Sequence, residues 1–144
     1  MKNTNEIPQL FLRFALGLGF ILPVMDRIGW IDKPGSTKVA WGDWTHFIDY
    51  TNSLMPFLGR SAANVMGFTA SLAEATIGIC LLLGFKIKLA SLGGALITLS
   101  FAICMMATQG IYAPFQYPVF VFTGACLVLS RLDNYKWSFD NILK

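Results

Sequence analysis

The stretch NVMGFTASLAEATIGICLLL, residues 64–83, is long and apolar enough to cross a membrane, and it carries one carboxylate, Glu74, near its middle. Small and polar residues recur along it at steps of three and four, which places them on one stripe of a helix. A charge inside the hydrocarbon core costs roughly 2.5–3.5 kcal/mol even on lenient insertion scales. Glu74 should therefore face the interior of a helix bundle, where it needs a partner, a proton or a ligand. The stripe consists of Asn64, Gly67, Ser71, Glu74 and Gly78.

The composition of the whole chain is that of an integral membrane protein. Of its 144 residues, 55% are hydrophobic and 13% are charged, whereas charged residues make up about 25% of a typical soluble domain. A membrane-spanning helix needs about 20 residues, so four crossings and their connections account for the length. The net charge of +3 is small and scattered, and the chain has no basic block of the kind that binds nucleic acid. We therefore expect no nucleic-acid partner.

Four apolar runs predict an all-α fold, an antiparallel bundle of four transmembrane helices that forms a single domain over residues 1–144. The first run is interpreted as a retained helix rather than a cleaved signal peptide, because Arg13 lies within it and no small-residue cleavage site follows. The turn after Gly84 is very short, so the second and third helices should pack side by side. The expected helices cover residues 7–25, 61–84, 89–107 and 115–130.

The only long polar connection is residues 26–60, which holds most of the tryptophan. Within it Trp41, Trp44, Phe47 and Ile48 stand at helical spacing, which predicts a short amphipathic helix at the membrane interface. Aromatic rings at such a place usually anchor a protein in the interface. A lid over a ligand site would have the same pattern.

The distribution of lysine and arginine outside the spans predicts the orientation of the chain. The side that holds the two termini and the second turn has six of these residues, and the opposite side has four. By the positive-inside rule both termini lie in the cytoplasm and residues 26–60 are extracytoplasmic, in a multi-pass protein of the cell (inner) membrane. The six are Lys2, Lys86, Lys88, Arg131, Lys136 and Lys144, and the four are Arg27, Lys33, Lys38 and Arg60.

The cysteines and the single histidine give little support to redox or metal chemistry within this chain. Cys80, Cys104 and Cys126 all fall in apolar runs without a C-x-x-C pair, so we interpret them as core filler. A dithiol centre would need a close pair. His46 is the only histidine, which excludes a haem held by two histidines. We expect no metal site and no intrinsic cofactor.

Two charges lie inside the expected spans and predict a site. Counted inward from residue 7 and from Gly84 at 1.5 Å per residue, Arg13 lies about 9 Å deep and Glu74 about 15 Å deep. An arginine side chain can reach over this difference, so we predict a buried Arg13–Glu74 ion pair. Such a pair either fixes only the register of the helices or marks an ion, proton or substrate path. The candidate ligand contacts are Gly17, Ser71, Gly78 and Trp44.

Two segments resemble the signatures of the DoxX family of small four-helix membrane proteins. The first is RFALGLGF, residues 13–20, followed by the basic Arg27, and the second runs from Glu74 through Gly78 and Gly84 to Lys88. The resemblance covers essentially the whole chain. It departs at the end of the first helix, where family members often have a His-Gly pair and this chain has Pro23-Val24. The resemblance implies a relation to the DoxD subunit of thiosulfate:quinone oxidoreductase and to membrane-anchored redox complexes.

Three functions remain open. In the first, the protein is a quinone-linked redox component in which Glu74 exchanges a proton with the quinone, and Arg13 either polarises a carbonyl or holds Glu74 ionised. Since the sequence shows no electron carrier, it would be at most an oxidoreductase subunit that depends on a membrane or soluble redox partner. The second is an accessory subunit that contacts a larger complex through small-residue faces such as Ala15/Gly19 and Ala63/Gly67. The third is a transporter of small molecules or lipids. In each case membrane lipids are partners, and the sequence leaves open whether the protein forms a homo-oligomer.

Overall fold

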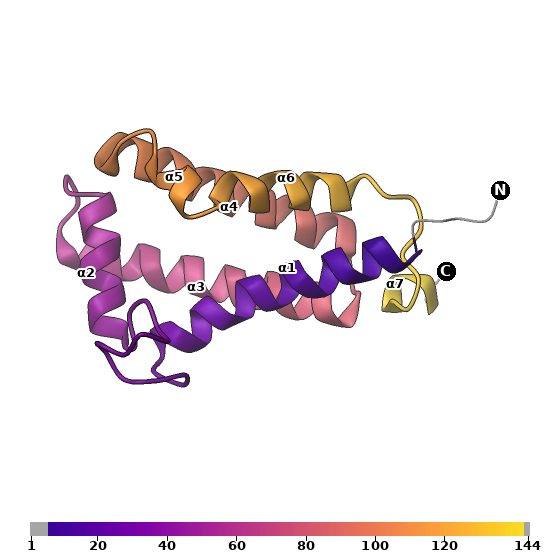
Figure 1. Cartoon of the computed structure of the whole chain (residues 1–144), viewed down its shortest axis with the longest axis horizontal. Helices are drawn as coiled ribbons and strands as arrows, with labels where there is room; N and C mark the ends of the chain where they lie inside the picture. The colour runs from indigo at the N-terminus through magenta and orange to yellow at the C-terminus, as the bar shows by residue number, and fades with distance from the viewer. Residues whose placement is uncertain (1–5, 143–144) are drawn as a thin grey trace.

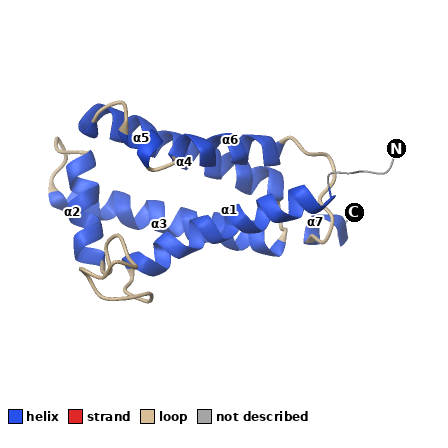
Figure 2. Cartoon of the chain, viewed as in Figure 1, coloured by secondary structure: helices blue, strands red, loops and turns tan. Residues whose placement is uncertain are grey.

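The computed structural model describes residues 6–142, and the regular structure of this range is entirely helical (Figure 2). The prediction of an all-α fold is confirmed over this range, and three of its helices, against the four predicted, are long and apolar enough to cross a membrane. α1 packs along α3, and α4 packs along α6 (Figure 1). The three long helices are α1 (Glu6–Arg27), α3 (Arg60–Leu83) and α4 (Ile87–Gln109).

The segment expected as a fourth helix is broken into two pieces. α5 (Ala113–Gln116) and α6 (Val119–Ser130) are separated by Tyr117 and Pro118. Tyr117 has an extended backbone, the conformation that a following proline favours. α6 has 12 residues and is about 18 Å long, shorter than the hydrocarbon core of about 30 Å.

The long connection contains the predicted short helix. α2 (Trp44–Leu54) begins after Asp43, whose carboxylate accepts a hydrogen bond of 2.8 Å from the backbone N–H of His46. Phe47, Ile48 and Leu54 are buried on one side of α2. In Figure 1 this helix lies across the ends of the long helices, so it closes one end of the molecule, called here the α2 end.

Two glycines set the crossing of α1 and α3. A Cβ added to Gly17 would lie 2.8 Å from the Leu82 side chain, and one added to Gly78 would lie 2.7 Å from Ile21. The same added Cβ atoms would lie 3.3 Å and 3.0 Å from the carbonyl oxygen of the opposite glycine. The backbones therefore approach closely at this level, as small residues allow between membrane helices.

The opposite end, called here the turn end, holds the α3–α4 turn and the last described residues. The carboxylate of Asp140 accepts hydrogen bonds from the backbone N–H groups of Lys86 and Ile87, at 2.7 and 2.8 Å. These are otherwise unsatisfied donors at the start of α4. Residues 131–142, which end in α7 (Phe139–Ile142), are thereby attached to the turn, and we call them the C-terminal segment.

Candidate functional site

Glu74 is buried in α3 and paired with an arginine, but the arginine is Arg27. The Nη1 atom of Arg27 lies 2.5 Å from Oε2 of Glu74, and both side chains are 5% exposed. The same nitrogen donates a hydrogen bond of 2.9 Å to the Ser71 hydroxyl. Because Ser71 and Glu74 are three residues apart, they share one face of α3 and hold the guanidinium together.

The predicted Arg13–Glu74 pair is wrong. Arg13 is buried, but it donates hydrogen bonds to the carbonyl oxygens of Lys136 and Trp137, at 3.3 and 2.7 Å. A Cβ at Gly84 would lie 2.9 Å from Nη1 of Arg13, so Arg13 is level with the end of α3 and not one or two turns inside it. Glu74 is ten residues from Gly84, about 15 Å along the helix. α1 begins beyond the end of α3 and packs there on the C-terminal segment, which shifts its register.

The four expected ligand contacts have different places in the structure. Ser71 holds Arg27, as described above. Gly17 and Gly78 form the close crossing of α1 and α3. The indole N–H of Trp44 donates a hydrogen bond of 2.8 Å to Oδ1 of Asn64. Of the four, only Ser71 is hydrogen-bonded to the Arg27–Glu74 pair within residues 6–142.

Two aromatic rings cover the guanidinium of Arg27. Its central carbon lies 4.2 Å from the ring centroid of Phe47 and 5.1 Å from that of Trp41. A cation over an aromatic face is attracted by roughly 0.5–2 kcal/mol, with the larger values at desolvated sites. The rings themselves meet edge to face with centroids 5.3 Å apart. α2 thus contributes Phe47 to the site, and the loop before α2 contributes Trp41.

Asp26 positions the loop that carries Trp41. Its carboxylate accepts hydrogen bonds from the backbone N–H groups of Ala40, Trp41 and Gly42, at 2.9, 3.2 and 2.8 Å. Gly42 has φ +74°, and a Cβ there would lie 2.5 Å from the backbone nitrogen of Pro34. The loop can therefore fold this tightly only with a glycine at this position. Asp26 and Arg27, consecutive residues at the end of α1, organise the loop and the pair respectively.

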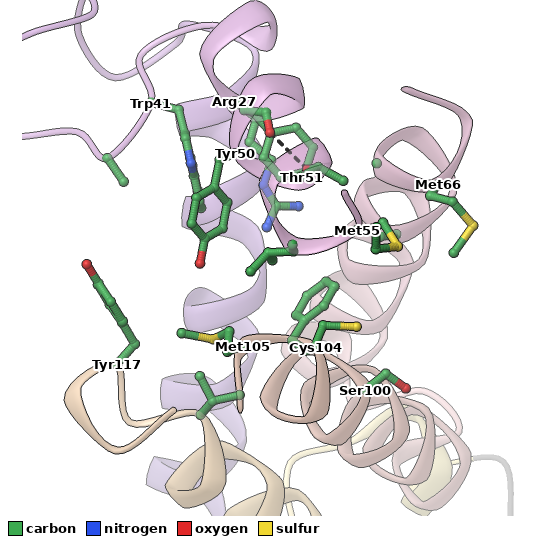
Figure 3. A pocket seen from close by; sticks show the side chains of 17 residues that line it. Arg27, Trp41, Tyr50, Thr51, Met55, Met66, Ser100, Cys104, Met105 and Tyr117 are labelled. Carbon is green, nitrogen blue, oxygen red and sulfur yellow. Dashed lines mark hydrogen bonds between the residues drawn. The ribbon is translucent and has the colours of Figure 1, made fainter. Parts of the chain in front are cut away.

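A cavity of about 420 Å³ adjoins Arg27 at the α2 end. This volume lies within the range of about 300–1,000 Å³ that is common for small-molecule sites. Figure 3 shows the guanidinium directed toward the space that Tyr50, Met55 and Met105 surround. Most of the wall is apolar or aromatic. It is lined by Arg27, Ala40, Trp41, Phe47, Tyr50, Thr51, Leu54, Met55, Met66, Gly67, Ala70, Ser100, Phe101, Cys104, Met105, Tyr117 and Val119.

Arg27 is also the one charged residue among those that line the cavity. Both of its hydrogen bonds leave from Nη1, and its buried Nε has no partner within residues 6–142. An unpaired buried donor costs about 1–3 kcal/mol, and more where the group is charged. Burial raises the pKa of Tyr50 above its ordinary value, so its phenol stays protonated at neutral pH and can also donate. The cavity therefore offers hydrogen-bond donors on an apolar background.

Sequence reasoning missed Arg27, Asp26 and the cavity. The spacing of four and three from Arg13 through Gly17, Phe20 and Val24 to Arg27 is a visible signal that Arg27 continues the buried face of α1. The apolar run itself ends at Met25, so hydrophobicity alone assigns Arg27 to the following loop. The other cavity residues come from α2, α3, α4 and the break before α6, and no local pattern unites them.

The remaining groups with chemical potential lie apart from one another. All three cysteines are free, and Cys104 lines the cavity while Cys126 is buried in the core. In the part of the chain that the structure describes, no three His, Cys, Asp or Glu side chains stand close enough to hold a metal ion. The site is thus an ion pair with an adjoining cavity.

No protein-family model, no curated protein and no solved structure matches this chain. Its class is therefore defined by its own fold and site. Over residues 6–142 it is a helical protein with three helices of membrane-spanning length, in which the arginine of a buried arginine–glutamate pair borders an apolar cavity.

Proposed function

We propose that this protein is a membrane-embedded component of a redox system and binds a quinone-like molecule in the cavity at the α2 end. One observation carries the proposal: the guanidinium of Arg27 borders an apolar cavity, and both of its hydrogen bonds within residues 6–142 leave from Nη1, so that Nη2 has donors available for a ligand. Glu74, Ser71 and two aromatic rings fix the guanidinium in place. Such a donor suits the carbonyl oxygen of a flat, apolar ring. The resemblance to the DoxX family points to the same ligand class.

The charge balance favours a neutral ligand over an anion. Glu74 already neutralises Arg27, and the buried carboxylate of Asp26 adds a negative charge next to Arg27 in the chain. A carboxylate or phosphate in the cavity would add another negative charge to a site of low polarity, where uncompensated charge is costly. A quinone carbonyl accepts hydrogen bonds without this cost.

The positions of the side chains change the roles expected for the charged residues. Glu74 is not among the residues that line the cavity, so it acts by positioning Arg27, and Arg27 takes the carbonyl-binding role expected of Arg13. The phenol of Tyr50 is placed to act as a second donor. The sequence shows no electron-carrier motif, so the proposed source of electrons is a membrane or soluble redox partner. Catalysis, where it occurs, is a property of that complex.

We propose four crossings, with the α5–α6 segment as the fourth, in the cell (inner) membrane and with both termini in the cytoplasm. The Gln9 side chain donates to the carbonyl oxygen of Lys136, so α1 begins at the same end at which the C-terminal segment lies. An even number of crossings fits this arrangement. The α2 end, with the cavity, then faces the extracytoplasmic side.

A purely accessory role has less support, because three of the four small residues of the expected contact faces pack within the chain, and only Ala15 is exposed. A Cβ at Gly19 would clash with the ring of Phe122, and one at Gly67 would lie 2.8 Å from Ile48. Ala63 is fully buried. These small residues therefore serve packing inside the molecule. A homo-oligomer would have to use other surfaces.

Binding of a decyl-substituted benzoquinone to the purified protein in nanodiscs tests the proposal, with quenching of tryptophan fluorescence as the signal. Arg27→Lys keeps the charge but not the planar fork of donors. We expect it to weaken binding at least about tenfold, since a hydrogen bond to a charged group contributes about 1.5–3 kcal/mol and about 1.4 kcal/mol is a factor of ten. Tyr50→Phe should weaken binding severalfold.

Arg60→Lys is the matched control, because Arg60 pairs with Asp49 on the exposed surface, outside the cavity. Its quinone affinity should equal that of the wild type. A long-chain fatty acid serves as the anionic competitor and should not displace the quinone. Unchanged affinity in both Arg27→Lys and Tyr50→Phe, or absence of quinone binding by the wild type, contradicts the proposal.

A further inference from the structure

The cavity reaches the outer surface between α3 and α4. Met66 of α3 lines the cavity and is 50% exposed, and Ser100 of α4 lines it and is exposed as well. Figure 1 shows the reason: α3 and α4 are joined at the turn end, diverge toward the α2 end, and have α2 lying across the gap. The residues that border this gap are Met66, Gly67 and Ala70 on α3, with Ser100, Phe101 and Cys104 on α4.

The opening lies well inside the long helices and not at their ends. Residues 66–70 are about 9–15 Å from the start of α3, and residues 100–104 are about 8–14 Å from the end of α4. The surface around the gap is apolar and exposed, with Val65, Phe68, Leu96 and Ile103 each at least 59% exposed. Along a helix that crosses a hydrocarbon core of about 30 Å, such a surface faces acyl chains.

The cavity is too small for a long lipid-soluble molecule. Its 420 Å³ suits a single substituted ring, and the polar group of Arg27 forms one wall. A long apolar tail attached to that ring has to leave the cavity, and the gap between α3 and α4 is an exit that leads to an apolar surface. Small side chains, Gly67, Ala70 and Ser100, border that exit.

We propose that the gap between α3 and α4 is a lateral portal, through which the ring of a lipid-soluble ligand enters the cavity from the bilayer and its tail remains among the acyl chains. This inference rests on the proposed function, because it requires a ligand at Arg27. It adds that the ligand is a membrane lipid-like molecule with an apolar tail. It also identifies Ala70 and Ser100 as residues that select for this tail.

Two ligands with the same ring test the portal. The first is a dimethoxy-methyl-benzoquinone with a decyl tail, and the second is the same ring without a tail. Ala70→Phe and Ser100→Phe narrow the gap from its two sides. We expect each to weaken binding of the tailed quinone about tenfold or more and to change binding of the tail-less ring less than about threefold.

Matched controls place the same bulk on the outer surface. Val65→Phe on α3 and Leu96→Phe on α4 change exposed residues that do not line the cavity, and both should bind both quinones as the wild type does. A thermal unfolding curve for every variant identifies any that fails to fold, and Ser100→Leu is then the milder narrowing variant.

The outcomes distinguish a failure of the portal proposal from a failure of the proposed binding site. Equal weakening of both quinones by the narrowing variants overturns the portal, because it means that the new ring fills the cavity itself. Unchanged binding of the tailed quinone by the narrowing variants also overturns the portal. Binding of the quinone by the wild type would then still support the proposed function. Absence of binding of either quinone to the wild type contradicts the proposed function and the portal with it.

Discussion

The side chains of Arg27 and Glu74 are each 5% exposed, so removing one leaves the other charge buried without its partner. Breaking a buried ion pair from one side typically costs about 3–5 kcal/mol, because it leaves an uncompensated charge. We expect Glu74→Gln and Arg27→Gln each to lower the free energy of unfolding by about this amount. The double substitution should cost less than the sum of the two, since no lone charge remains. Denaturant titrations in detergent micelles measure all three.

An exposed pair of the same chemistry gives the control. Arg60 and Asp49 also form an ion pair, but both side chains are 55% exposed. Exposed pairs contribute about 0–1 kcal/mol, so Asp49→Asn should hardly change the free energy of unfolding. A cost of Glu74→Gln no larger than that of Asp49→Asn would mean that the buried pair does not stabilise the fold.

Tyr135 gives a pH-dependent contribution to stability at the turn end. Its hydroxyl donates a hydrogen bond of 2.8 Å to the Leu129 carbonyl oxygen. Burial, together with the charges of Asp140 and Asp133, raises its pKa from 10.0 to about 12. Because the folded-state pKa is the higher one, the contribution is complete below pH 10 and is lost as the pH rises toward about 12.

Tyr135→Phe should therefore cost about 1 kcal/mol near neutral pH, the usual contribution of one hydrogen bond, and the difference from wild type should shrink above pH 10. Unfolding of both proteins at several alkaline pH values measures the difference, in which other titrating groups cancel. A difference that stays constant through this range would show that Tyr135 titrates normally in the folded protein.

At the scale of the helix, α1 shows which features the sequence could predict. Its span and its buried face follow from local spacing: Arg13, Gly17, Phe20 and Arg27 are all buried, and their separations of four, three and seven residues keep them on one face of the helix. The register of α1 against α3 does not follow from local spacing. It depends on the contact of Gly17 with Gly78 and on hydrogen bonds from Arg13 to backbone more than a hundred residues away.

The candidate site was predictable to the same extent. A carboxylate in an apolar helix must have a partner, and Glu74 has one, but the identity of that partner is a matter of register. α2 was predictable from aromatic residues at helical spacing. The contact of Phe47 in this helix with the guanidinium was not predictable. It depends on the neighbouring loop, which Asp26 positions through three backbone hydrogen bonds, and side-chain patterns do not encode these.

Arg13 attaches the C-terminal segment to α1. Its two hydrogen bonds to carbonyl oxygens of residues 136 and 137 disappear in Arg13→Met, which keeps much of the apolar length of the side chain. We expect the segment to detach more often and trypsin to cleave after Arg131 and Lys136 several times faster than in the wild type. Limited proteolysis followed by mass spectrometry measures this.

The control for Arg13→Met is Lys88→Met, which removes an exposed basic residue at the same end of the molecule. Its cleavage rate after Arg131 should equal that of the wild type. Quinone binding at the α2 end should be unchanged in both variants, since Arg13 does not line the cavity. Equal proteolysis of Arg13→Met and wild type would mean that the contacts of Gln9, Tyr135 and Asp140 hold the segment without Arg13.

The whole molecule has two ends with different roles. At the turn end, the C-terminal segment packs under α1, α3 and α4 and is fixed by Arg13, Tyr135 and Asp140. At the α2 end, the helices diverge (Figure 1), and the cavity lies between them. Because the helices are held together at the turn end and diverge at the α2 end, a ligand can enter at the α2 end without unfolding the protein. This arrangement depends on the segment from α5 to α6 returning the chain to the turn end.

Cysteine labelling tests whether that return is a membrane crossing. α6 alone is about 18 Å long, but α5 and the extended Tyr117-Pro118 lengthen the path between the two ends. In a background with Cys80, Cys104 and Cys126 replaced by alanine, we expect exposed cysteines at Lys88→Cys and Asn134→Cys to react with an impermeant maleimide only after the cells are opened. Thr37→Cys, on the loop before α2, should react in intact cells. Labelling of positions 88 and 134 from opposite sides would mean that the α5–α6 segment does not cross. The cavity would then belong to a bundle of three spans with a segment lying across one face.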